Sequence, residues 1–278
     1  MSREITFGYS PCPNDTFAFH ALSHGLVKAP GFKFKTRLGD VEELNRLALQ
    51  SILEVTKLSF HALGHVLDKY ALLNAGSALG RGCGPLVVAK PGAEPADLAK
   101  VKVAVPGRLT TAQMLLSLYL GKTPEVEPME FSQVMEAVAQ GRFKAGLVIH
   151  EGRFTYERLG LIRLLDLGEW WEAETGLPIP LGCIAMRRDL GKEAYGIIDR
   201  ALGESVNMAM QHPLKSKEYV LAHAQEMEAS VVESHIGLYV NDFTADLGEA
   251  GLKAVEEALI RGRQSGLLPQ TDYPLRME

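Results

Sequence analysis

The chain has 278 residues, of which 46 % are hydrophobic, so it can bury one large core or the cores of two medium-sized domains. Its 34 acidic and 29 basic residues give a net charge of −5 and a pI near 5.9. This balance gives no sign of the basic face or stripe that a nucleic-acid-binding protein needs, and it argues against binding to anionic membranes.

The start of the chain and its cysteines favour a cytoplasmic protein. Residues 1–10 lead directly into a strand-like segment and contain no apolar core of a secretion signal. No segment approaches the roughly 18 uncharged apolar residues of a membrane span. Cys12, Cys83 and Cys183 lie far apart, and we expect them to be free thiols in a reducing compartment.

Residues 1–95 alternate between short apolar and amphipathic segments, which is the pattern of a parallel sheet covered by helices. The predicted strands are residues 5–9, 32–38, 55–58, 70–74 and 85–89. The predicted helices are residues 16–24, 41–48 and 59–67, the second with Asp40 as its N-cap. Glycines at positions 76, 80, 82 and 84 predict a flexible loop before the last of these strands.

Residues 90–96 are rich in proline and glycine and mark the first predicted boundary. The alternation then restarts with strands at residues 101–105, 126–129, 145–149 and 161–166, and with helices at residues 110–120, 133–140 and around Trp170 and Trp171. Residues 176–182 form the second boundary. Beyond it, the periodicity predicts long helices at residues 189–211, with Asp189 as N-cap, and at 214–225, 231–239 and 249–266.

This order of elements predicts two α/β lobes joined by two crossings of the chain. The inner, smaller lobe comprises residues 96–178, and the outer, larger lobe comprises residues 1–95 and 179–278 with a helical C-terminal part. Such an interrupted layout is typical of clamshell proteins that bind a small ligand between their lobes. A single larger sheet is the alternative.

His150 follows the buried strand predicted at residues 145–149 and precedes a Glu-Gly-Arg turn. In open α/β sheets the carboxyl ends of the strands face the ligand crevice, so His150 is expected at the mouth of a pocket. Alternatively, it is a strand-end histidine that hydrogen-bonds a backbone carbonyl.

Polar residues follow two further strands, one in each predicted lobe. Thr110 and Thr111 open a helix after a Pro-Gly-Arg turn, where unpaired backbone N–H groups favour a carboxylate or phosphate. An ordinary threonine N-cap is the alternative. In the outer lobe, Lys57 stands near Ser59 at an apolar strand end, and it either needs a buried partner or extends to solvent.

Other chemistry-bearing residues give weaker signals. Cys12 lies in a rigid Ser-Pro-Cys-Pro turn, but no neighbouring His or Lys would activate its thiol. His20 and His24, like His61 and His65, are four residues apart on one helix face, but no nearby carboxylate completes a metal site. We therefore expect no metal, and we expect these histidines on helix surfaces. Nucleotide phosphate-binding motifs are absent.

Several segments, in order and spacing, resemble the 1,4-dihydroxy-6-naphthoate synthase family of the futalosine route to menaquinone. They are Ser10-Pro-Cys-Pro-Asn-Asp-Thr-Phe, Thr56-Lys-Leu-Ser59, Gly80-Arg-Gly-Cys-Gly-Pro-Leu-Val-Val, Val105-Pro-Gly-Arg-Leu-Thr-Thr-Ala112 and Ile149-His-Glu-Gly-Arg-Phe-Thr-Tyr156. Together they extend over most of the chain, and the helical C-terminal third contributes least.

The resemblance implies a fold like that of the type II periplasmic binding proteins, used here as an enzyme. Members convert cyclic de-hypoxanthine futalosine, an aromatic carboxylate, into 1,4-dihydroxy-6-naphthoate by a carbon–carbon lyase step without a known cofactor. Carried over by motif, His150 is the proton acceptor. The substrate-binding residues implied are Lys57, Leu58 and Ser59 in one lobe and Thr110 and Thr111 in the other.

Two alternatives stay open at this point. A sister enzyme of the same fold dehydrates chorismate earlier in the pathway, although the Ile149-His-Glu-x-Arg-Phe-Thr-Tyr pattern favours the later step. A non-catalytic clamshell that binds a small carboxylate is the other. An exported receptor would need a signal segment, and a regulator would need a DNA-binding domain for which no residues remain.

Overall fold

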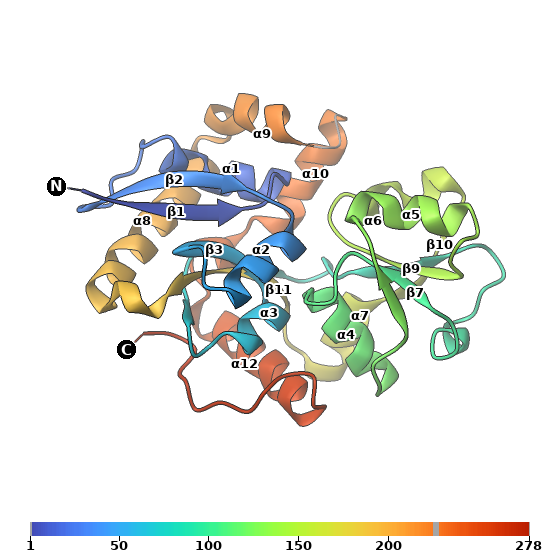
Figure 1. The fold of residues 1–278 in the computed structure, drawn as a ribbon. Helices are drawn as coiled ribbons and strands as arrows, with labels where there is room; N and C mark the ends of the chain where they lie inside the picture. The colour runs from blue at the N-terminus through green and yellow to red at the C-terminus, as the bar shows by residue number, and fades with distance from the viewer. Residues whose placement is uncertain (1, 225–227, 278) are drawn as a thin grey trace.

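Two separate sheets organise the chain, and helices cover each of them (Figure 1). The computed structural model describes residues 2–224 and 228–277. The first sheet has the strand order β2-β1-β3-β11-β4, and β5 pairs with β11; the second has the order β10-β6-β9-β7-β8. Within the described ranges the two sheets share no strand, which excludes the alternative of a single larger sheet.

The strands follow the predicted apolar segments closely. Those of the first sheet are β1 (Arg3–Tyr9), β2 (Phe32–Leu38), β3 (Val55–Ser59), β4 (Tyr70–Leu72), β5 (Ala78–Gly80) and β11 (Ile179–Arg187). Those of the second sheet are β6 (Leu86–Ala89), β7 (Val103–Val105), β8 (Val126–Pro128), β9 (Ala145–Val148) and β10 (Ile162–Asp166). Every residue of β3 is buried, whereas β2 alternates between half-buried and exposed residues because it is an edge strand.

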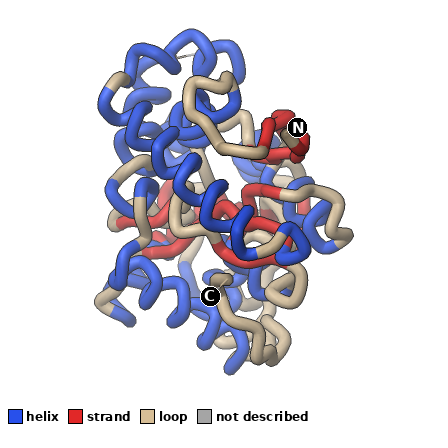
Figure 2. The backbone as a smooth tube through the Cα atoms, turned by 90° about the vertical axis from the view of Figure 1, so that its left-hand side faces the viewer, coloured by secondary structure: helices blue, strands red, loops and turns tan. Residues whose placement is uncertain are grey.

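Helices flank the strands on both sides, as the turned view of Figure 2 also shows. The N-terminal half contains α1 (Pro13–Ser23), α2 (Val41–Leu49), α3 (Phe60–His65), α4 (Thr111–Leu120) and α5 (Phe131–Ala139). The remainder contains α6 (Gly152–Thr155), α7 (Leu167–Thr175), α8 (Lys192–Gln211), α9 (Lys217–His223), α10 (Ala229–Tyr239), α11 (Asp242–Ala245) and α12 (Gly248–Gln264).

The sheets are mixed, so the prediction of a parallel sheet is wrong for part of each. In the first sheet, β11 runs antiparallel to β3, β4 and β5. β11 was not predicted from the sequence because a proline within an apolar run disfavours a strand. Pro180 is accommodated beside an irregularity in the pairing of β11 with β5, between Pro180 and Gly182.

The chain enters the second sheet earlier than the predicted boundary at residues 95 and 96. β6 pairs with β9 and β10, so it lies in the second sheet although the prediction grouped it with the first. The glycine-rich segment before it also contains the short strand β5, where a flexible loop was expected. Proline and glycine content therefore marked a turn within the second lobe rather than the crossing itself.

The helical C-terminal part forms as expected, with one shifted helix start. Asp189 lies in a short 3-10 helix, Arg188–Leu190, and pairs with Arg187 at 2.7 Å instead of capping α8. α8 begins at Lys192 after Gly191, whose φ of 88° suits glycine. The end of the helix predicted at residues 214–225 falls partly outside the described residues.

A shared hydrophobic core joins the two lobes on one side. The same buried cluster includes Leu58 of β3, Trp171 of α7 and Leu259 of α12. The Trp171 indole is fully buried and donates to the carbonyl of Pro178 at 3.1 Å. Arg261 of α12 lies over its ring at 5.6 Å from the centroid. α12 therefore fastens the second lobe to the first.

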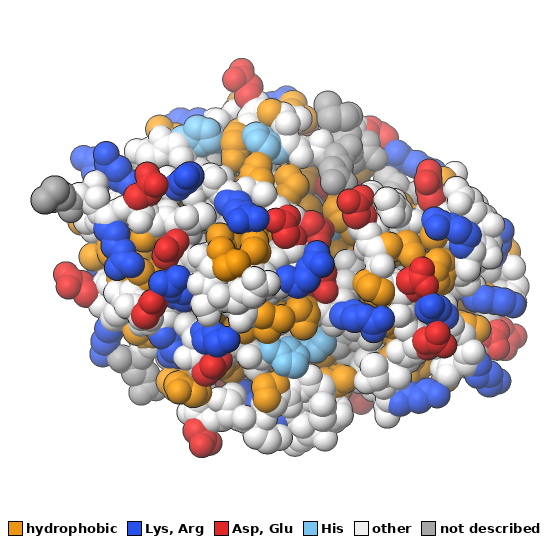
Figure 3. All heavy atoms as spheres, viewed as in Figure 1, with side chains coloured by type: hydrophobic (Ala, Val, Ile, Leu, Met, Phe, Trp, Pro, Cys, Tyr) orange, Lys and Arg blue, Asp and Glu red, His pale blue; other side chains and the backbone are white. Residues whose placement is uncertain are grey.

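The molecular surface mixes charges of both signs. On the face shown in Figure 3, acidic and basic side chains are interspersed without a stripe of one sign. In the part of the chain that the structure describes, no helix combines the length and the apolar character needed to cross a membrane.

Gly84 offers a test of how closely the loop before β6 approaches α7. A Cβ added at Gly84 would lie 2.2 Å from the amide nitrogen of Gly168. This clash is with backbone atoms, so it cannot be relieved by rotation of a side chain. We predict that Gly84→Ala lowers the free energy of unfolding by about 2 kcal/mol or more, measured by urea denaturation.

Gly196→Ala is the matched control, because Gly196 lies inside α8 and its added Cβ would have no neighbour closer than 3.6 Å. It should raise stability by about 0.5–1 kcal/mol, since alanine favours the helix. Equal stability of the Gly84 variant and the unmodified protein would contradict the close approach.

Candidate functional site

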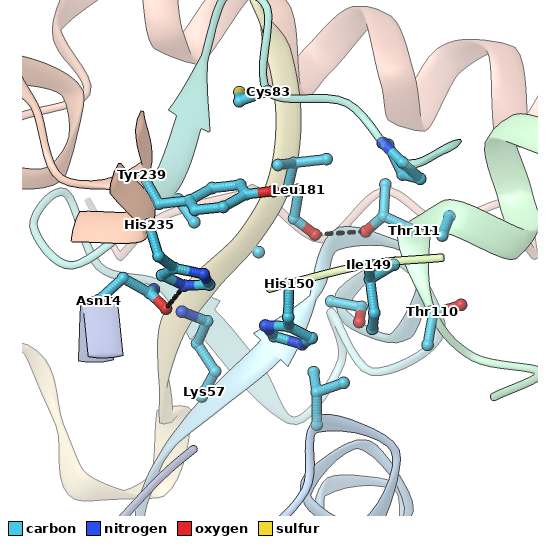
Figure 4. Close-up of a pocket in the computed structure, with 16 residues that line it drawn as sticks. Asn14, Lys57, Cys83, Thr110, Thr111, Ile149, His150, Leu181, His235 and Tyr239 are labelled. Atoms are coloured by element: carbon cyan, nitrogen blue, oxygen red, sulfur yellow. Dashed lines mark hydrogen bonds between the residues drawn. The ribbon is translucent and has the colours of Figure 1, made fainter. Parts of the chain in front are cut away.

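A cavity of about 80 Å³ lies between the lobes, where segments from both sheets meet (Figure 4). Polar residues predicted from the sequence line it together. They are Lys57, Ser59, Thr110, Thr111 and His150. Asn14, Cys83, His235 and Tyr239 also line the cavity, and none of them was predicted to bind substrate. The structure thus gathers five of the six predicted site residues around one space.

Lys57 has the buried partner that its position in an apolar strand requires. Its Nζ lies 2.5 Å from Oδ1 of Asp15, and the two side chains are only 8 % and 1 % exposed. The Asp15 carboxylate also accepts from the amide and hydroxyl of Ser10 and from Nδ2 of Asn14. Lys57 is therefore a paired buried cation, and the alternative of a lysine extended to solvent is wrong.

His235 of α10 is buried against the cavity, and Asn14 links it to the same polar group. Its Nε2 lies 2.9 Å from Oδ1 of Asn14. Burial lowers the pKa of His235 well below its usual value, and the charges of His150 and Lys57 lower it further. Its Nδ1 is buried without a hydrogen-bond partner among the described residues. No signal in the sequence distinguished His235 from a core histidine.

His150 stands at the end of β9 in an unusual backbone conformation. Its φ is 56°, in the left-handed region that residues other than glycine rarely adopt. Arg153 holds the next turn in place: its guanidinium donates to the Gly84 carbonyl at 2.6 Å and to Oδ2 of Asp166 at 2.7 Å. The strain at His150 is therefore maintained by contacts within the second lobe, as is common at functional sites.

The half-buried His150 ring contacts other rings and makes no hydrogen bond within the described part of the chain. The His235 ring lies nearly parallel to it, with centroids 6.1 Å apart and an interplanar angle of 6°. The Phe131 ring also lies near it, at 5.2 Å between centroids and tilted by 49°. The alternative of a strand-end histidine bonded to a carbonyl is thus wrong, and the ring nitrogens are free to meet a ligand.

Cys12, His150 and Glu151 bring one possible ligand atom each within 4.8 Å of the others. A thiol binds metal as the thiolate, but burial raises the pKa of Cys12 well above its usual value, and the Glu151 charge raises it further. This set therefore fits a metal poorly, and the same shift argues against Cys12 as a nucleophile.

Both threonines at the start of α4 use their hydroxyls within the protein. Thr110 caps the helix by accepting from the Gln113 amide at 3.2 Å. The Thr111 hydroxyl donates to the Leu181 carbonyl at 2.5 Å and accepts from the Phe60 amide at 2.9 Å. A ligand carboxylate at this helix start would thus meet the backbone N–H groups of the first turn rather than the hydroxyls.

Ser59 and Leu58 take different positions at the end of β3. The amide of Ser59 donates to Oδ1 of Asn45 at 2.9 Å, and its hydroxyl lies 3.2 Å from Nδ2 of Asn45. Ser59 lines the cavity, whereas the Leu58 side chain is fully buried in the shared core. Strand alternation explains the difference, because successive side chains point to opposite faces.

Glu42 of α2 joins the lobes at the edge of the cavity. Its carboxylate accepts from the backbone amides of Arg108 at 2.9 Å and Leu109 at 3.1 Å. A Cβ added at Gly107 would lie 2.4 Å from this carboxylate, so the Glu42 side chain would have to shift to accommodate it. These hydrogen bonds join the two lobes, and they were not predicted from the sequence.

Neither histidine pair belongs to a group of three or more possible metal ligands among the described residues. His20 and His24 pack together at 4.4 Å between ring centroids. His61 is buried, so the prediction that it lies on a helix surface is wrong. Its Nδ1 lies 3.2 Å from the Thr110 carbonyl. Burial lowers the pKa of His61 to about 4, and the neighbouring His65 contributes to the shift.

Comparison with known proteins places this chain among enzymes of one pathway. A family model described as menaquinone biosynthesis matches residues 5–264. The 1,4-dihydroxy-6-naphthoate synthase of Thermus thermophilus is 48 % identical over 271 residues, which cover 98 % of each chain. The enzyme of the same name from Streptomyces coelicolor is also 48 % identical, over 95 % of each chain.

Solved structures give the same fold. Protein AF1704 from Archaeoglobus fulgidus superposes with a TM-score of 0.89 at 37 % identity, covering 95 % of this chain and 98 % of that one. The alkanesulfonate-binding protein SsuA from Xanthomonas axonopodis has a TM-score of 0.72 at 13 % identity, covering 97 % and 96 %. At such low identity the second likeness shows the periplasmic-binding-protein fold alone.

Removal of the Lys57 charge tests the buried ion pair. Lys57→Met would leave the Asp15 carboxylate buried without its cation, and we predict a loss of about 3–5 kcal/mol in the free energy of unfolding. Urea denaturation measures it. Arg37→Met is the control, because the Arg37–Glu43 pair is exposed and should change stability by less than about 1 kcal/mol. Equal effects of the two substitutions would contradict the assignment.

Protonation of His61 predicts a pH-dependent stability. Below pH 6.5 the unfolded chain takes up a proton at His61, whereas the folded chain resists protonation until about pH 4. The contribution of neutral His61 to the free energy of unfolding is therefore fully present above pH 6.5. It falls as the pH drops towards 4, and the loss is roughly 2 kcal/mol at pH 5. Denaturation at pH 7 and pH 5 should show a smaller loss for His61→Asn than for the unmodified protein; parallel losses would refute the prediction.

Proposed function

Because this chain belongs to the menaquinone-biosynthesis family of 1,4-dihydroxy-6-naphthoate synthases, we propose that His150 is the general base of its reaction. The enzyme is a lyase that converts cyclic de-hypoxanthine futalosine into 1,4-dihydroxy-6-naphthoate. Release of a polyol fragment from the carbocycle requires removal of a proton near neutral pH. Histidine suits this task, because its ordinary pKa is near 6.5.

The position of the His150 ring is the observation that carries the proposal. The ring reaches the cavity between the lobes from a strained strand end, and neither nitrogen is engaged by the described residues. The lysine lining the same cavity is paired with Asp15, and the thiol of Cys12 has a raised pKa. His150 is thus the side chain best placed to accept a proton from a bound molecule.

The substrate carboxylate has two positive features to meet. Lys57 supplies a buried cation, and the start of α4 at Thr110 and Thr111 supplies N–H groups and the positive end of a helix dipole. Ser59 completes this side of the proposed substrate site. Leu58 contributes no side chain to it, because that side chain lies in the core.

The small size of the cavity supports a separation of the lobes on substrate entry as part of the proposal. Sites for small molecules commonly measure about 300–1,000 Å³, well above the approximately 80 Å³ present here. Glu42 and Thr111 join the lobes around the cavity. In the proposed cycle, the lobes close over the substrate, expel water and bring His150 to the reacting carbon. A cytoplasmic location is part of the same proposal.

The test is turnover of cyclic de-hypoxanthine futalosine by purified protein without added metal or cofactor. Naphthoate formation is followed by mass and absorbance. We predict that His150→Ala reduces turnover by about 10²–10⁴-fold while the dissociation constant for substrate, measured by calorimetry, changes only a few-fold.

His24→Ala is the control, because His24 is exposed at the C-terminal end of α1 and does not line the cavity. It should leave turnover unchanged. Full activity of His150→Ala would remove His150 from the mechanism. Binding without turnover by the unmodified protein would instead favour a clamshell that only binds a small carboxylate.

A further inference from the structure

A buried chain of polar groups runs from Lys57 to His235 along one wall of the cavity. Oδ1 of Asp15 accepts hydrogen bonds from the Lys57 ammonium, at 2.5 Å, and from Nδ2 of Asn14, at 2.8 Å. An ionised carboxylate can only accept hydrogen bonds, so the nitrogen of the Asn14 amide must face Asp15. The Asn14 oxygen is thereby turned towards His235, at 2.9 Å from its Nε2.

This orientation fixes the tautomer of His235. The Asn14 oxygen is an acceptor, so Nε2 of His235 must carry the hydrogen in that contact. Burial keeps the pKa of the ring well below its usual value, and the ring is therefore neutral near pH 7. Its second nitrogen, Nδ1, then carries a lone pair and no hydrogen.

Nδ1 has no partner among the described residues although it is buried. An unsatisfied buried acceptor destabilises a folded protein, and such groups are rare without a functional cause. The His235 ring lies in the cavity wall between Tyr239 and His150, as Figure 4 shows, with ring centroids 4.6 Å and 6.1 Å away. The missing donor is thus expected from a molecule in the cavity.

We propose that Nδ1 of His235 accepts a hydrogen bond from a hydroxyl group of the bound substrate. The inference rests on the proposed function, because it takes the cavity as the substrate site. It adds a second kind of recognition to that site: Lys57 and the start of α4 offer donors and positive charge to a carboxylate, whereas His235 offers an acceptor to a hydroxyl. Together they orient the substrate with respect to His150.

Two substitutions of His235 separate its two nitrogens. In His235→Gln the longer side chain keeps a donor near the Asn14 oxygen and places no acceptor at Nδ1. In His235→Asn the shorter amide places its oxygen near the position of Nδ1 and no longer reaches Asn14. Both are made in the His150→Ala background, so that cyclic de-hypoxanthine futalosine is bound and not consumed during calorimetry.

We expect His235→Gln to raise the dissociation constant about ten- to a hundredfold, and His235→Asn to raise it clearly less. Equal weakening by both, or unchanged binding by the Gln variant, would overturn the acceptor role. Circular dichroism and thermal unfolding of each variant establish whether it is folded.

A spectroscopic measurement keeps the inference testable even if a variant does not fold. In ¹⁵N-histidine-labelled His150→Ala, whose remaining ring signals include His235, Nε2 of His235 should be protonated and Nδ1 unprotonated. Saturating substrate should move the Nδ1 resonance towards the protonated range. A protonated Nδ1 in the free protein, or an Nδ1 resonance unmoved by saturating substrate, would refute the proposal.

The two proposals fail in different ways. If the unmodified protein produces no naphthoate, the proposed function fails whatever His235 does. If the unmodified protein is active and His235→Gln binds substrate as tightly as its parent, only the role of His235 fails.

Discussion

The buried ion pair between Lys57 and Asp15 is the constraint on which the rest of the site depends. A lysine inside a fully buried strand would be costly without a partner, and the first turn of α1 supplies that partner. The pair fixes α1 against β3, and Asp15 orients Asn14, which in turn orients His235. The need of Lys57 for a buried partner thus determines which hydrogen-bonding atoms Asn14 and His235 present along this wall of the cavity.

The cavity also depends on how the two lobes are joined. β11 returns the chain to the first sheet beside β3. The Thr111 hydroxyl at the start of α4 donates a hydrogen bond to the Leu181 carbonyl of β11. On another side of the cavity, Trp171 and α12 share one apolar core, whereas Glu42 joins the lobes only through hydrogen bonds to backbone amides. In the proposed lobe closure, the apolar core would act as the fixed edge, and the Glu42 hydrogen bonds would break at the other edge.

The sequence predicted the parts of the site that local patterns encode. His150 and Thr110 follow apolar strand segments or a glycine turn, and Lys57 stands out as a charge among buried residues. The missing parts depend on contacts between distant segments. Nothing near Glu42 or His235 in sequence indicates their partners, which lie 66 and 221 residues away. β11 was missed for a related reason, since its pairing with β3 outweighs the cost of Pro180.

Two histidines face one another across the cavity, and their different surroundings suit the different roles proposed for them. His235 is enclosed and held by Asn14 in one neutral form, whereas His150 is half-buried at a strand end with both ring nitrogens unengaged by described residues. A proton taken up by His150 would further disfavour protonation of His235, because like charges 6.1 Å apart repel. If His150 accepts the proton as proposed, the acceptor at His235 persists, and the substrate stays oriented through the step.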